Sequence, residues 1–238
     1  MAERKSLAQA VGATRYPGRG IIAGLHKDGK RAVAAYFIMG RSANSRNRVF
    51  ELKDGALKTR ARDEAAMVDP SLILYTALRV CGSYTIVTNG NQTDTIAEAI
   101  AHGGDSIAAL CAREYEPDAP NFTPRISAVL DARGGGLCYQ LSILKRASGE
   151  PASCQRFFYQ YDAPQPGVGH FIHTYSGDGE PLPSFSGEPE PIPLGGSIDE
   201  ITGELWEYLD EENKVALYVR TIDLPTGCVD ERIVNKYA

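Results

Sequence analysis

Short apolar runs separated by turn signals recur along the chain and predict antiparallel β-sheet. Residues 20–25 and 32–39 are apolar and flank Lys27-Asp28-Gly29-Lys30, and Asp-Gly between apolar runs indicates a β-hairpin. Residues 214–222 alternate apolar and polar positions, as a half-buried strand does. The same interpretation predicts further strands over residues 49–52, 84–88, 125–131, 137–144, 155–161 and 169–175.

Start and stop signals predict four helices among these strands. Asp69-Pro70 combines a capping side chain with a proline suited to the first helical turn, and Gly82 is a stop signal. Ser197 with Glu200 three residues later forms a capping box. The predicted helices span about residues 69–81, 93–102, 105–115 and 197–210. Because hairpins lie toward both ends of the chain and helices mostly between them, this order predicts an α+β fold with antiparallel sheet rather than alternating βαβ units.

The composition is that of an ordinary globular protein. Of the 238 residues, 43% are hydrophobic and 23% are charged, which disfavours a disordered chain or a fibre. No apolar run approaches the ~20 residues that span a bilayer, and residues 1–10 lack the apolar core of a secretory signal. The five cysteines show no CxxC and no short Cys/His spacing, which is typical of reduced thiols and disfavours a zinc site. We therefore expect a cytoplasmic protein that does not enter membranes.

Charge is unevenly distributed along the chain. Residues 1–156 have a net charge of +6 and residues 157–238 a net charge of −11. The uneven charge indicates either an acidic solvated face or a functional site to which the first two-thirds of the chain contribute the cationic side chains. A net acidic chain without Lys/Arg tracts argues against nucleic-acid binding. Closely spaced prolines in residues 181–193 favour an extended loop, which we interpret as a surface insertion within one domain.

Two polar segments contain candidate ligand-binding residues. Residues 41–48 hold three arginines and two asparagines directly after an apolar strand, and guanidinium groups form paired bonds to phosphate and carboxylate. Residues 88–95 lead from a strand through a polar turn into a helix N-terminus, where exposed N–H groups favour anions. Each segment also has a structural explanation, the first as a solvated loop and the second as a turn with a helix cap.

Tyr75 and Glu116 are ambiguous when they are considered alone. Tyr75 falls within a predicted helix, where a tyrosine is usually a core residue. Glu116 precedes Pro117, which places it at the C-terminal edge of a predicted helix, where the helix dipole raises the affinity of a carboxylate for a proton. Glu116 is therefore either an exposed helix-end acid or, if partly desolvated, a general base.

Several motifs of nucleotide, hydrolase and metal sites are absent from the sequence. There is no Gly-rich phosphate loop of the Rossmann or P-loop type, and there is no GxSxG nucleophile elbow. His170 and His173 lie on one predicted strand, but no third metal ligand is near them in the sequence. The residues therefore indicate no metal and no cofactor.

Taken in order, several strings resemble the archaeal-type IMP cyclohydrolase family. The resemblance covers about residues 16–131, and after them only His173-Thr174-Tyr175 matches. Its most specific parts are Val87-Thr88-Asn89-Gly90, Thr93-Asp94-Thr95-Ile96-Ala97 and Thr123-Pro124-Arg125-Ile126. The remaining matches are Tyr16-Pro17-Gly18-Arg19-Gly20-Ile21, Ala35-Tyr36, Arg41-Ser42, Arg46, Asp69-Pro70, Tyr75, Arg79-Val80 and Tyr115-Glu116.

The resemblance implies a four-layer αββα sandwich of antiparallel sheets, of the N-terminal-nucleophile (Ntn) hydrolase type. It also implies an enzyme of purine biosynthesis that closes 5-formamidoimidazole-4-carboxamide ribotide (FAICAR) to IMP with loss of water, without a metal or cofactor. The family's catalytic positions fall on Arg46, Tyr75 and Glu116. We expect the nucleotide to be bound by Arg19, Arg41, Ser42, Asn89, Gly90, Thr93, Asp94, Thr123 and Arg125.

A hypothetical mechanism follows from the resemblance. Glu116 would take a proton from the carboxamide nitrogen of the substrate, and Arg46 and Tyr75 would stabilise the oxyanion on the formyl carbon. Tyr75 would then protonate the departing hydroxyl. We expect residues 1–15 to be an N-terminal extension and residues 16–238 to be one domain, with the acidic, Pro-rich insertion near residues 176–196. The expected partner is a nucleotide, and homo-oligomerisation is left open.

Two other functions remain open from the sequence. An amide hydrolase on the same fold would cleave C–N bonds, and it would need a Cys, Ser or Thr nucleophile exposed by processing. A non-catalytic purine-nucleotide-binding protein would bind IMP without turnover. The presence of Arg46, Tyr75 and Glu116 counts against this second alternative.

Overall fold

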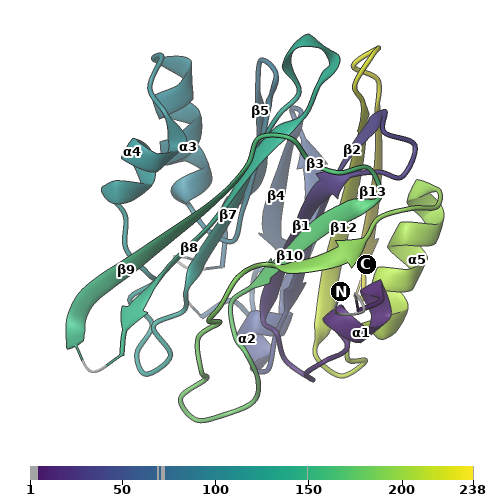
Figure 1. The fold of residues 1–238 in the computed structure, drawn as a ribbon. Coiled ribbons are helices and arrows are strands. Elements are labelled where there is room, and N and C mark those ends of the chain that lie inside the picture. Colours follow the sequence, from purple (N-terminus) through teal and green to yellow (C-terminus); the bar gives the residue numbers. More distant parts are fainter. Residues whose placement is uncertain (1–4, 69, 71–72, 149, 238) are drawn as a thin grey trace.

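Two antiparallel β-sheets form the centre of the structure, a computed structural model that describes residues 5–68, 70, 73–148 and 150–237 (Figure 1). The six-stranded sheet contains β1 (Arg19–Leu25), β2 (Arg31–Met39), β10 (Val168–His173), β11 (Glu190–Pro193), β12 (Lys214–Asp223) and β13 (Val229–Asn235), in the order β11-β10-β1-β2-β12-β13. The seven-stranded sheet contains β3 (Arg48–Lys53), β4 (Ala56–Ala61), β5 (Thr76–Cys81), β6 (Tyr84–Thr88), β7 (Arg125–Asp131), β8 (Cys138–Ala147) and β9 (Glu150–Tyr161), side by side in chain order.

Helices cover the outer face of each sheet (Figure 1). The helices α1 (Leu7–Val11) and α5 (Ile198–Tyr208) pack on the six-stranded sheet, and α3 (Gln92–Ala101) and α4 (Ser106–Cys111) pack on the seven-stranded sheet. The layers therefore run helix, sheet, sheet, helix. A single turn, α2 (Ala43–Arg46), lies between β2 and β3, and a 3₁₀ turn spans Arg133–Gly135. Within the described residues, none of the helices has the length and apolar character needed to cross a membrane.

The apolar run of β2 is continuous because both of its faces are buried. Successive side chains of a strand point to opposite faces. Tyr36 and Ile38 lie in the core between the two sheets, whereas Phe37 and Met39 lie in the core beneath α1 and α5. A strand buried on both sides needs apolar residues at every position, which explains why β2 lacks the alternation seen in half-buried strands.

The two sheets are in contact at one edge, where β3 lies against β12 and β13. The side chain of Asn235 makes two hydrogen bonds to the backbone of Phe50, accepting from its N–H at 2.7 Å and donating to its carbonyl at 3.0 Å. Asn235 thereby satisfies the backbone of β3 as a neighbouring strand would, and it ties the end of the chain to the second sheet.

Most of the predicted elements are confirmed. The α+β class with antiparallel sheet is confirmed, and so is the hairpin around Asp28-Gly29. The capping box is also confirmed, because the Ser197 hydroxyl accepts from the Glu200 N–H at 3.2 Å and the Glu200 carboxylate accepts from the Ser197 N–H at 2.6 Å. The third predicted helix was too long, because α4 ends at Cys111 rather than near Tyr115.

The predicted helix over residues 69–81 was wrong. Its second half is the strand β5, which pairs with β4 and with β6. In the segment from Thr76 to Cys81, successive side chains point to opposite faces of the sheet, and the backbone pairs with a strand on each side. This pairing outweighs the local capping signal at Pro70. Asp69, on which that signal partly rested, lies outside the described residues.

Several elements were not predicted at all. The strands β4, β11 and β13 and the short helices α1 and α2 fall in segments that we interpreted as loops or left unassigned. The Pro-rich segment ends in β11, which pairs with β10 at the edge of the six-stranded sheet. Proline is tolerated there because an edge strand needs hydrogen-bond donors on one side only.

Candidate active site

Five polar side chains gather between the two sheets at one end of the molecule. They are Arg19 at the start of β1, Tyr36 on β2, Arg48 at the start of β3, Tyr75 just before β5, and Glu116 in the segment after α4. Arg19 interacts electrostatically with Glu116 and Tyr75, and Arg48 interacts electrostatically with both tyrosines. We call these five residues the buried cluster.

The two tyrosines of the buried cluster are joined through their hydroxyls, whose oxygens lie 2.6 Å apart. Tyr36 is completely buried and Tyr75 is 8% exposed. Burial raises the pKa of Tyr75, and the positive charges of Arg48 and Arg19 oppose that rise. Burial also raises the pKa of Tyr36. Both phenols are therefore neutral at physiological pH, and each can donate a proton.

Glu116 is the single carboxylate of the buried cluster, and it is only 2% exposed. Burial raises its pKa to about 7, although Arg19 and Arg125 favour the ionised form. Our sequence-based explanation of its raised proton affinity was wrong, because α4 ends at Cys111 and Glu116 is not at a helix end. Its backbone N–H instead donates to the carbonyl of Thr123 at 2.9 Å. The raised pKa of Glu116 is therefore caused by desolvation and not by a helix dipole.

Arg48 is a member of the buried cluster that the sequence did not single out from Arg41 and Arg46. It is 0% exposed. Its Nε donates to the carbonyl of Ser45 at 2.8 Å and its Nη2 to the carbonyl of Met39 at 3.1 Å. Burial lowers its pKa, and the like charge of Arg19 lowers it further. The start of β3 thus fixes a cation between the sheets.

Three atoms of the buried cluster lack a hydrogen-bond partner. Among the described residues, seven buried side-chain nitrogen or oxygen atoms are unpaired, and three of them are Arg19 Nε, Arg48 Nη1 and Glu116 Oε2. Leaving a buried donor or acceptor unpaired costs about 1–3 kcal/mol each, and more for charged groups. A concentration of such atoms at one place is what a binding site for a polar ligand requires.

Arg125 lies beside the buried cluster and is held by the predicted turn. Its Nη1 donates to Gln92 Oε1 at 2.8 Å and lies 3.8 Å from Glu116 Oε1. The amide of Gln92 in turn donates to Asn89 Oδ1 at 3.1 Å. Gly90 makes room for this arrangement, because a Cβ at that position would stand 2.3 Å from Arg125 Nη1. The turn therefore positions Arg125, whereas the helix cap expected there is not formed, because Asn91 at the start of α3 makes no side-chain capping bond.

The remaining polar residues of the turn and of residues 123–126 already have partners within the protein. Thr93 shares a hydrogen bond with the Thr88 hydroxyl at 2.7 Å, and Asp94 pairs with Arg79 at 2.7 Å. The Thr123 hydroxyl lies 2.5 Å from that of Tyr175 and also bonds to Asp118. Thr93 and Thr123 are buried, whereas Asp94 is partly exposed.

Arg46 lies outside the buried cluster in this structure. Its Nε donates to the carbonyl of Gly40 at 2.9 Å, and its Nη2 donates to Asn213 Oδ1 at 3.2 Å and to Glu212 Oε1 at 3.4 Å. The structure therefore brings Tyr75 and Glu116 together, and it places Arg46 on α2 at the rim of the same end.

Arg41 and Ser42 lie next to Arg46. The guanidinium of Arg41 stands over the ring of Tyr16, 5.1 Å from its centre, and Tyr16 stacks on Tyr175. The Ser42 hydroxyl accepts from the Ser45 N–H at 3.1 Å and caps α2. The exposed Arg41 thus lies next to Tyr16 and Tyr175, and this aromatic pair extends to Thr123 and to the buried cluster.

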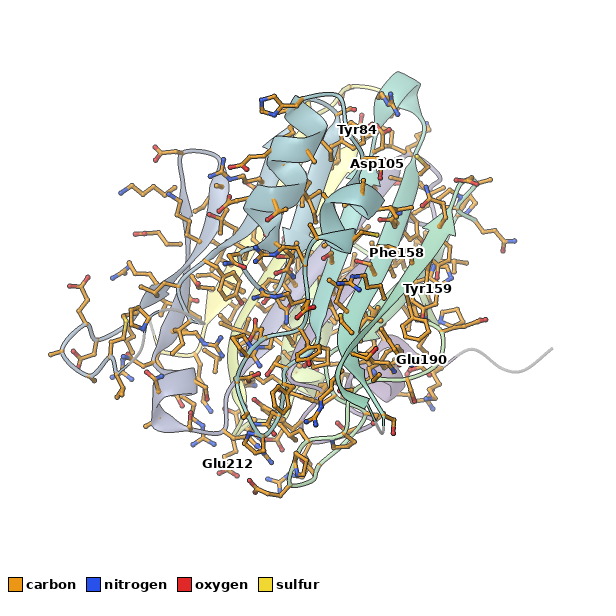
Figure 2. All side chains as sticks on the ribbon, turned by 90° about the vertical axis from the view of Figure 1, so that its left-hand side faces the viewer. Tyr84, Asp105, Phe158, Tyr159, Glu190 and Glu212 are labelled. Atoms are coloured by element: carbon orange, nitrogen blue, oxygen red, sulfur yellow. The ribbon has the colours of Figure 1, made fainter. Side chains whose placement is uncertain are left out.

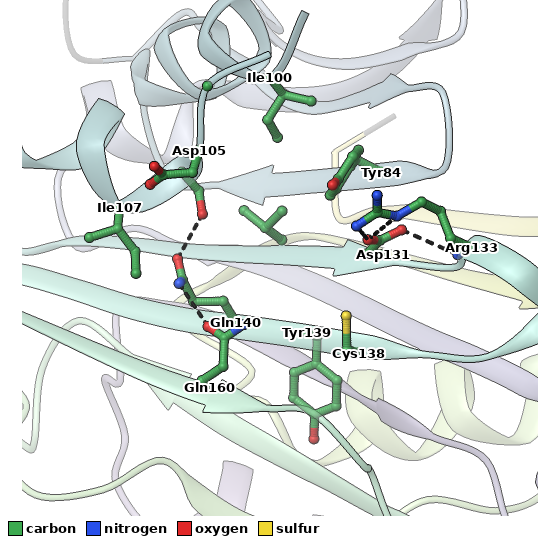
Figure 3. A pocket seen from close by; sticks show the side chains of 13 residues that line it. Tyr84, Ile100, Asp105, Ile107, Asp131, Arg133, Cys138, Tyr139, Gln140 and Gln160 are labelled. Atoms are coloured by element: carbon green, nitrogen blue, oxygen red, sulfur yellow. Dashed lines mark hydrogen bonds and ion pairs between the residues drawn. The ribbon is translucent and has the colours of Figure 1, made fainter.

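A pocket of about 320 Å³ lies elsewhere, at the opposite end of the seven-stranded sheet (Figure 3). Figure 2 shows Tyr84 and Asp105, which line it, far from Glu212, which contacts Arg46. Its polar side chains satisfy one another: Ser106 bonds to Gln140, Gln140 bonds to Gln160, and Asp131 pairs with Arg133. No unpaired buried atom lines this pocket in the described part of the chain, so the buried cluster is the better candidate site.

No metal centre is evident in the part of the chain that the structure describes. Within residues 5–68, 70, 73–148 and 150–237, no three His, Cys, Asp or Glu side chains come together in a way that could hold a metal ion. The five cysteines are all free thiols. The chemical groups at the candidate site are therefore guanidinium groups, phenols and one carboxylate.

Sequence reasoning missed Tyr16, Tyr36, Arg48 and Gln92 as members of the site or its support. One signal was available for Tyr36, because a lone phenol inside an otherwise apolar run must find a hydrogen-bond partner when it is buried. No local signal separates Arg48 from Arg46. Arg46 ends the turn α2 whereas Arg48 begins β3, so the point at which the chain passes from the turn into the strand decides which arginine lies between the sheets.

Fold and site together define a class of protein. A carboxylate with a pKa of about 7 beside neutral phenols can take and give protons, and several arginines make the same region suited to an anionic substrate. These are the features of an enzyme that uses acid–base chemistry on a small anion, carried on an α+β fold with two antiparallel sheets.

Comparison with known proteins identifies the family. The model of the IMP cyclohydrolase-like protein family matches residues 16–227, and the chain belongs to this family. It is 30% identical to an IMP cyclohydrolase of Methanopyrus kandleri over 164 residues, which cover 67% of this chain and 75% of that protein. It is 32% identical to an IMP cyclohydrolase of Haloquadratum walsbyi over 154 residues, which cover 63% and 73% of the two chains. Identity to the IMP cyclohydrolase of Methanocaldococcus jannaschii is 35% over 118 residues, or 49% and 57% of the two chains.

Proposed function

We propose that this protein is an IMP cyclohydrolase, which closes the pyrimidine ring of FAICAR to give IMP and water in purine biosynthesis. The observation that carries the proposal is the buried cluster, where Glu116 and Tyr75 share one site with unpaired guanidinium atoms. The family to which the chain belongs supports the same activity. The substrate is an anionic phosphomonoester, which fits a site rich in arginine.

The reaction balances with the groups at hand. The carboxamide nitrogen of the substrate attacks its own formyl carbon, and the nitrogen loses a proton to Glu116. That proton passes from Glu116 to the formyl oxygen, which becomes a hydroxyl and then leaves as water with a second proton, from Tyr75. The formamido nitrogen loses its own N–H proton as the carbon–nitrogen double bond forms and completes the ring. Holding an amide nitrogen and a formamide in contact supplies much of the acceleration, up to ~7–11 kcal/mol in ideal cases.

The raised pKa of Glu116 suits the role of a base. A carboxylate with a pKa of about 7 is largely ionised at pH 8 and accepts a proton more readily than an ordinary glutamate. The neighbouring Arg19 and Arg125 limit how far burial raises that pKa. Glu116 therefore stays available as a base near neutral pH, which an uncompensated buried carboxylate would not.

We assign the stabilisation of the oxyanion to Arg46 together with Tyr75. In this structure Arg46 pairs with Glu212, whose side chain is 65% exposed. Exposed ion pairs contribute little, about 0–1 kcal/mol, so exchanging this partner for a substrate oxygen costs little. We propose that a change of side-chain rotamer turns Arg46 from α2 toward a bound substrate, which also exchanges its bonds to the Gly40 carbonyl and to Asn213 Oδ1.

The phosphate of the substrate would be bound by arginines at the same end, with Arg19, Arg41 and Arg125 as the candidates. Arg19 and Arg125 interact electrostatically with Glu116, whereas Arg41 is exposed and lies over the ring of Tyr16. Arg41 is therefore the strongest candidate for the phosphate, with the hydroxyl of Ser42 next to it. Thr123 remains a candidate for direct substrate contact.

The turn residues Asn89, Gly90, Thr93 and Asp94 remain part of the proposed substrate region. Asn89 and Thr93 already bond within the protein. We therefore propose that these two act by holding Arg125 and the start of β7 in place. Asp94, which is partly exposed, can still meet the ligand directly.

We also propose that the helix–sheet–sheet–helix arrangement is of the Ntn-hydrolase type, and that residues 16–238 are one domain. Residues 1–15 are an extension whose helix α1 packs its Leu7 and Val11 into the core shared with α5. The five free cysteines are in keeping with a cytoplasmic location.

The test is incubation of the purified protein with FAICAR. Absorbance together with chromatography and mass measurement should detect IMP, with the loss of one water molecule per substrate. Binding of IMP without turnover would instead favour a nucleotide-binding protein. An intact mass that shows cleavage up to a Cys, Ser or Thr would favour an amide hydrolase.

A further inference from the structure

The hydroxyls of Tyr36 and Tyr75 form a buried pair whose two members differ in their surroundings. Tyr36 is 0% exposed, and its ring packs against Phe50 at 5.5 Å between ring centres. Tyr75 is 8% exposed and precedes the strand β5 rather than lying within a sheet. Among the described residues, each hydroxyl has the other as its only hydrogen-bond partner.

This difference determines which hydroxyl donates. If Tyr75 donated to Tyr36, the proton of Tyr36 would be buried in the core without an acceptor, which is unfavourable. If Tyr36 donates to the oxygen of Tyr75, the proton of Tyr75 is left for a group on the more open side. The second arrangement satisfies the more deeply buried hydroxyl, so we assign Tyr36 as the donor.

We propose that Tyr36 is a positioning residue for the catalytic step: its hydroxyl donates to the oxygen of Tyr75 and thereby directs the Tyr75 proton toward the leaving hydroxyl of the substrate. This inference rests on the proposed function. Arg19 and Arg48 support it, because both place positive charge near the Tyr75 oxygen. Two cations and one donated hydrogen bond stabilise the tyrosinate that forms when Tyr75 gives up its proton.

The proton balance closes over one turnover. The O–H bond of Tyr75 breaks as the leaving hydroxyl becomes water, and Tyr36 remains protonated throughout. The proton that Glu116 takes from the carboxamide nitrogen has by then converted the formyl oxygen to that hydroxyl. The formamido nitrogen gives up its N–H proton as the double bond forms, and transfer of this proton to Tyr75 through Glu116 or solvent restores both residues, so no further reactant is needed.

The experiment compares Tyr36→Phe with Tyr218→Phe in the FAICAR assay. Tyr218 is a matched control, because it lies directly opposite Tyr36 in the register of β2 and β12, in the same core. Its hydroxyl donates to Glu231, which also pairs with Arg220. Loss of a hydrogen bond to an ionised oxygen corresponds to about a tenfold change in rate. We expect Tyr36→Phe to lower kcat about tenfold or more, with KM within twofold of wild type, and Tyr218→Phe to leave both unchanged.

A double variant separates positioning from a merely structural role. Because Tyr36 acts through Tyr75, Tyr36→Phe should cost nothing further in a Tyr75→Phe background, and both proteins should unfold at the same temperature as their parents within a few degrees. Equal kcat values for Tyr36→Phe and wild type, or full additivity with Tyr75→Phe, would overturn the inference. Absence of turnover by the wild-type protein would instead refute the proposed function itself.

Discussion

Glu116 and Arg125 face each other at 3.8 Å between Oε1 and Nη1, and both side chains are buried. The distance is too long for a hydrogen bond, and the same guanidinium nitrogen already donates to Gln92 at 2.8 Å. Arg125 therefore offsets only part of the free-energy cost of burying the Glu116 carboxylate. The result is a glutamate whose pKa lies at about 7, between that of an exposed acid and that of an isolated buried one.

Activity should depend on pH through Glu116. The base must be ionised to accept a proton, and burial raises its pKa from 4.5 to about 7. We expect kcat/KM to rise as pH increases through about 7 and to fall about tenfold for each unit below it. Rates measured between pH 5.5 and 8.5 test this. The exposed neighbour Glu114 supplies a control, because Glu114→Gln should leave the profile unchanged, and a flat wild-type profile would exclude Glu116 as the base.

Stability should respond to the same carboxylate in the opposite direction. The pKa of Glu116 is raised in the folded state, so the folded protein binds more protons than the unfolded chain between pH 4.5 and about 7. The contribution of Glu116 is most favourable below about 4.5 and is lost as pH rises through about 7. Glu116→Gln should therefore raise the free energy of unfolding by about 1–3 kcal/mol at pH 8 relative to wild type, and by less at pH 5. Denaturant unfolding at both pH values measures this, and an equal effect at both would contradict the assignment.

Gly90 should be intolerant of a side chain. A Cβ there would stand 2.3 Å from Arg125 Nη1 and 2.7 Å from Gln92 Oε1, so Gly90→Ala must displace Arg125 from Glu116. Because small misplacements at a catalytic site are costly, we expect kcat/KM to fall about 10- to 100-fold. Gly203→Ala on α5 is the control, since its Cβ would meet no atom within 4 Å. Wild-type kinetics for Gly90→Ala would show that Arg125 plays no part.

Arg46 and Arg15 give a further test, since both pair with Glu212. If Arg46 turns to the substrate and stabilises the oxyanion, Arg46→Ala should lower kcat about 10²-fold. Arg15→Ala should have no effect on kcat, although it removes a comparable surface ion pair. Steady-state kinetics of the two variants decides between them, and addition of guanidine should restore part of the Arg46→Ala activity. Equal, small effects would leave Arg46 as a structural residue of α2.

The sequence predicted the strands well where turns and apolar periodicity agree. The strands β6, β7 and β12 lie where their patterns indicated. The segment before Cys81 shows the limit, because Asp69-Pro70 is a good helix start, yet the backbone beyond it completes a sheet. Pairing with β4 and β6 is a long-range interaction, and no local signal reports it.

The candidate site was predictable in parts. Resemblance pointed to Tyr75 and Glu116, which the structure brings into one buried cluster, whereas periodicity alone had placed Tyr75 in a helix. Arg48 could not be predicted, and for Tyr36 only the need of a buried phenol for a hydrogen-bond partner could be, because their roles depend on which strand faces meet when two sheets stack. Burial of Glu116, which sets its pKa, likewise depends on residues distant in the sequence.

The rate of IMP formation from FAICAR at pH 8, measured for wild type, Glu116→Gln and Glu114→Gln, decides whether Glu116 catalyses ring closure. We expect turnover well above the uncatalysed rate for wild type and Glu114→Gln, and a fall in kcat of ~10²-fold or more for a folded Glu116→Gln. Ring closure at the wild-type rate by Glu116→Gln, or no acceleration by the wild-type protein, would contradict this expectation.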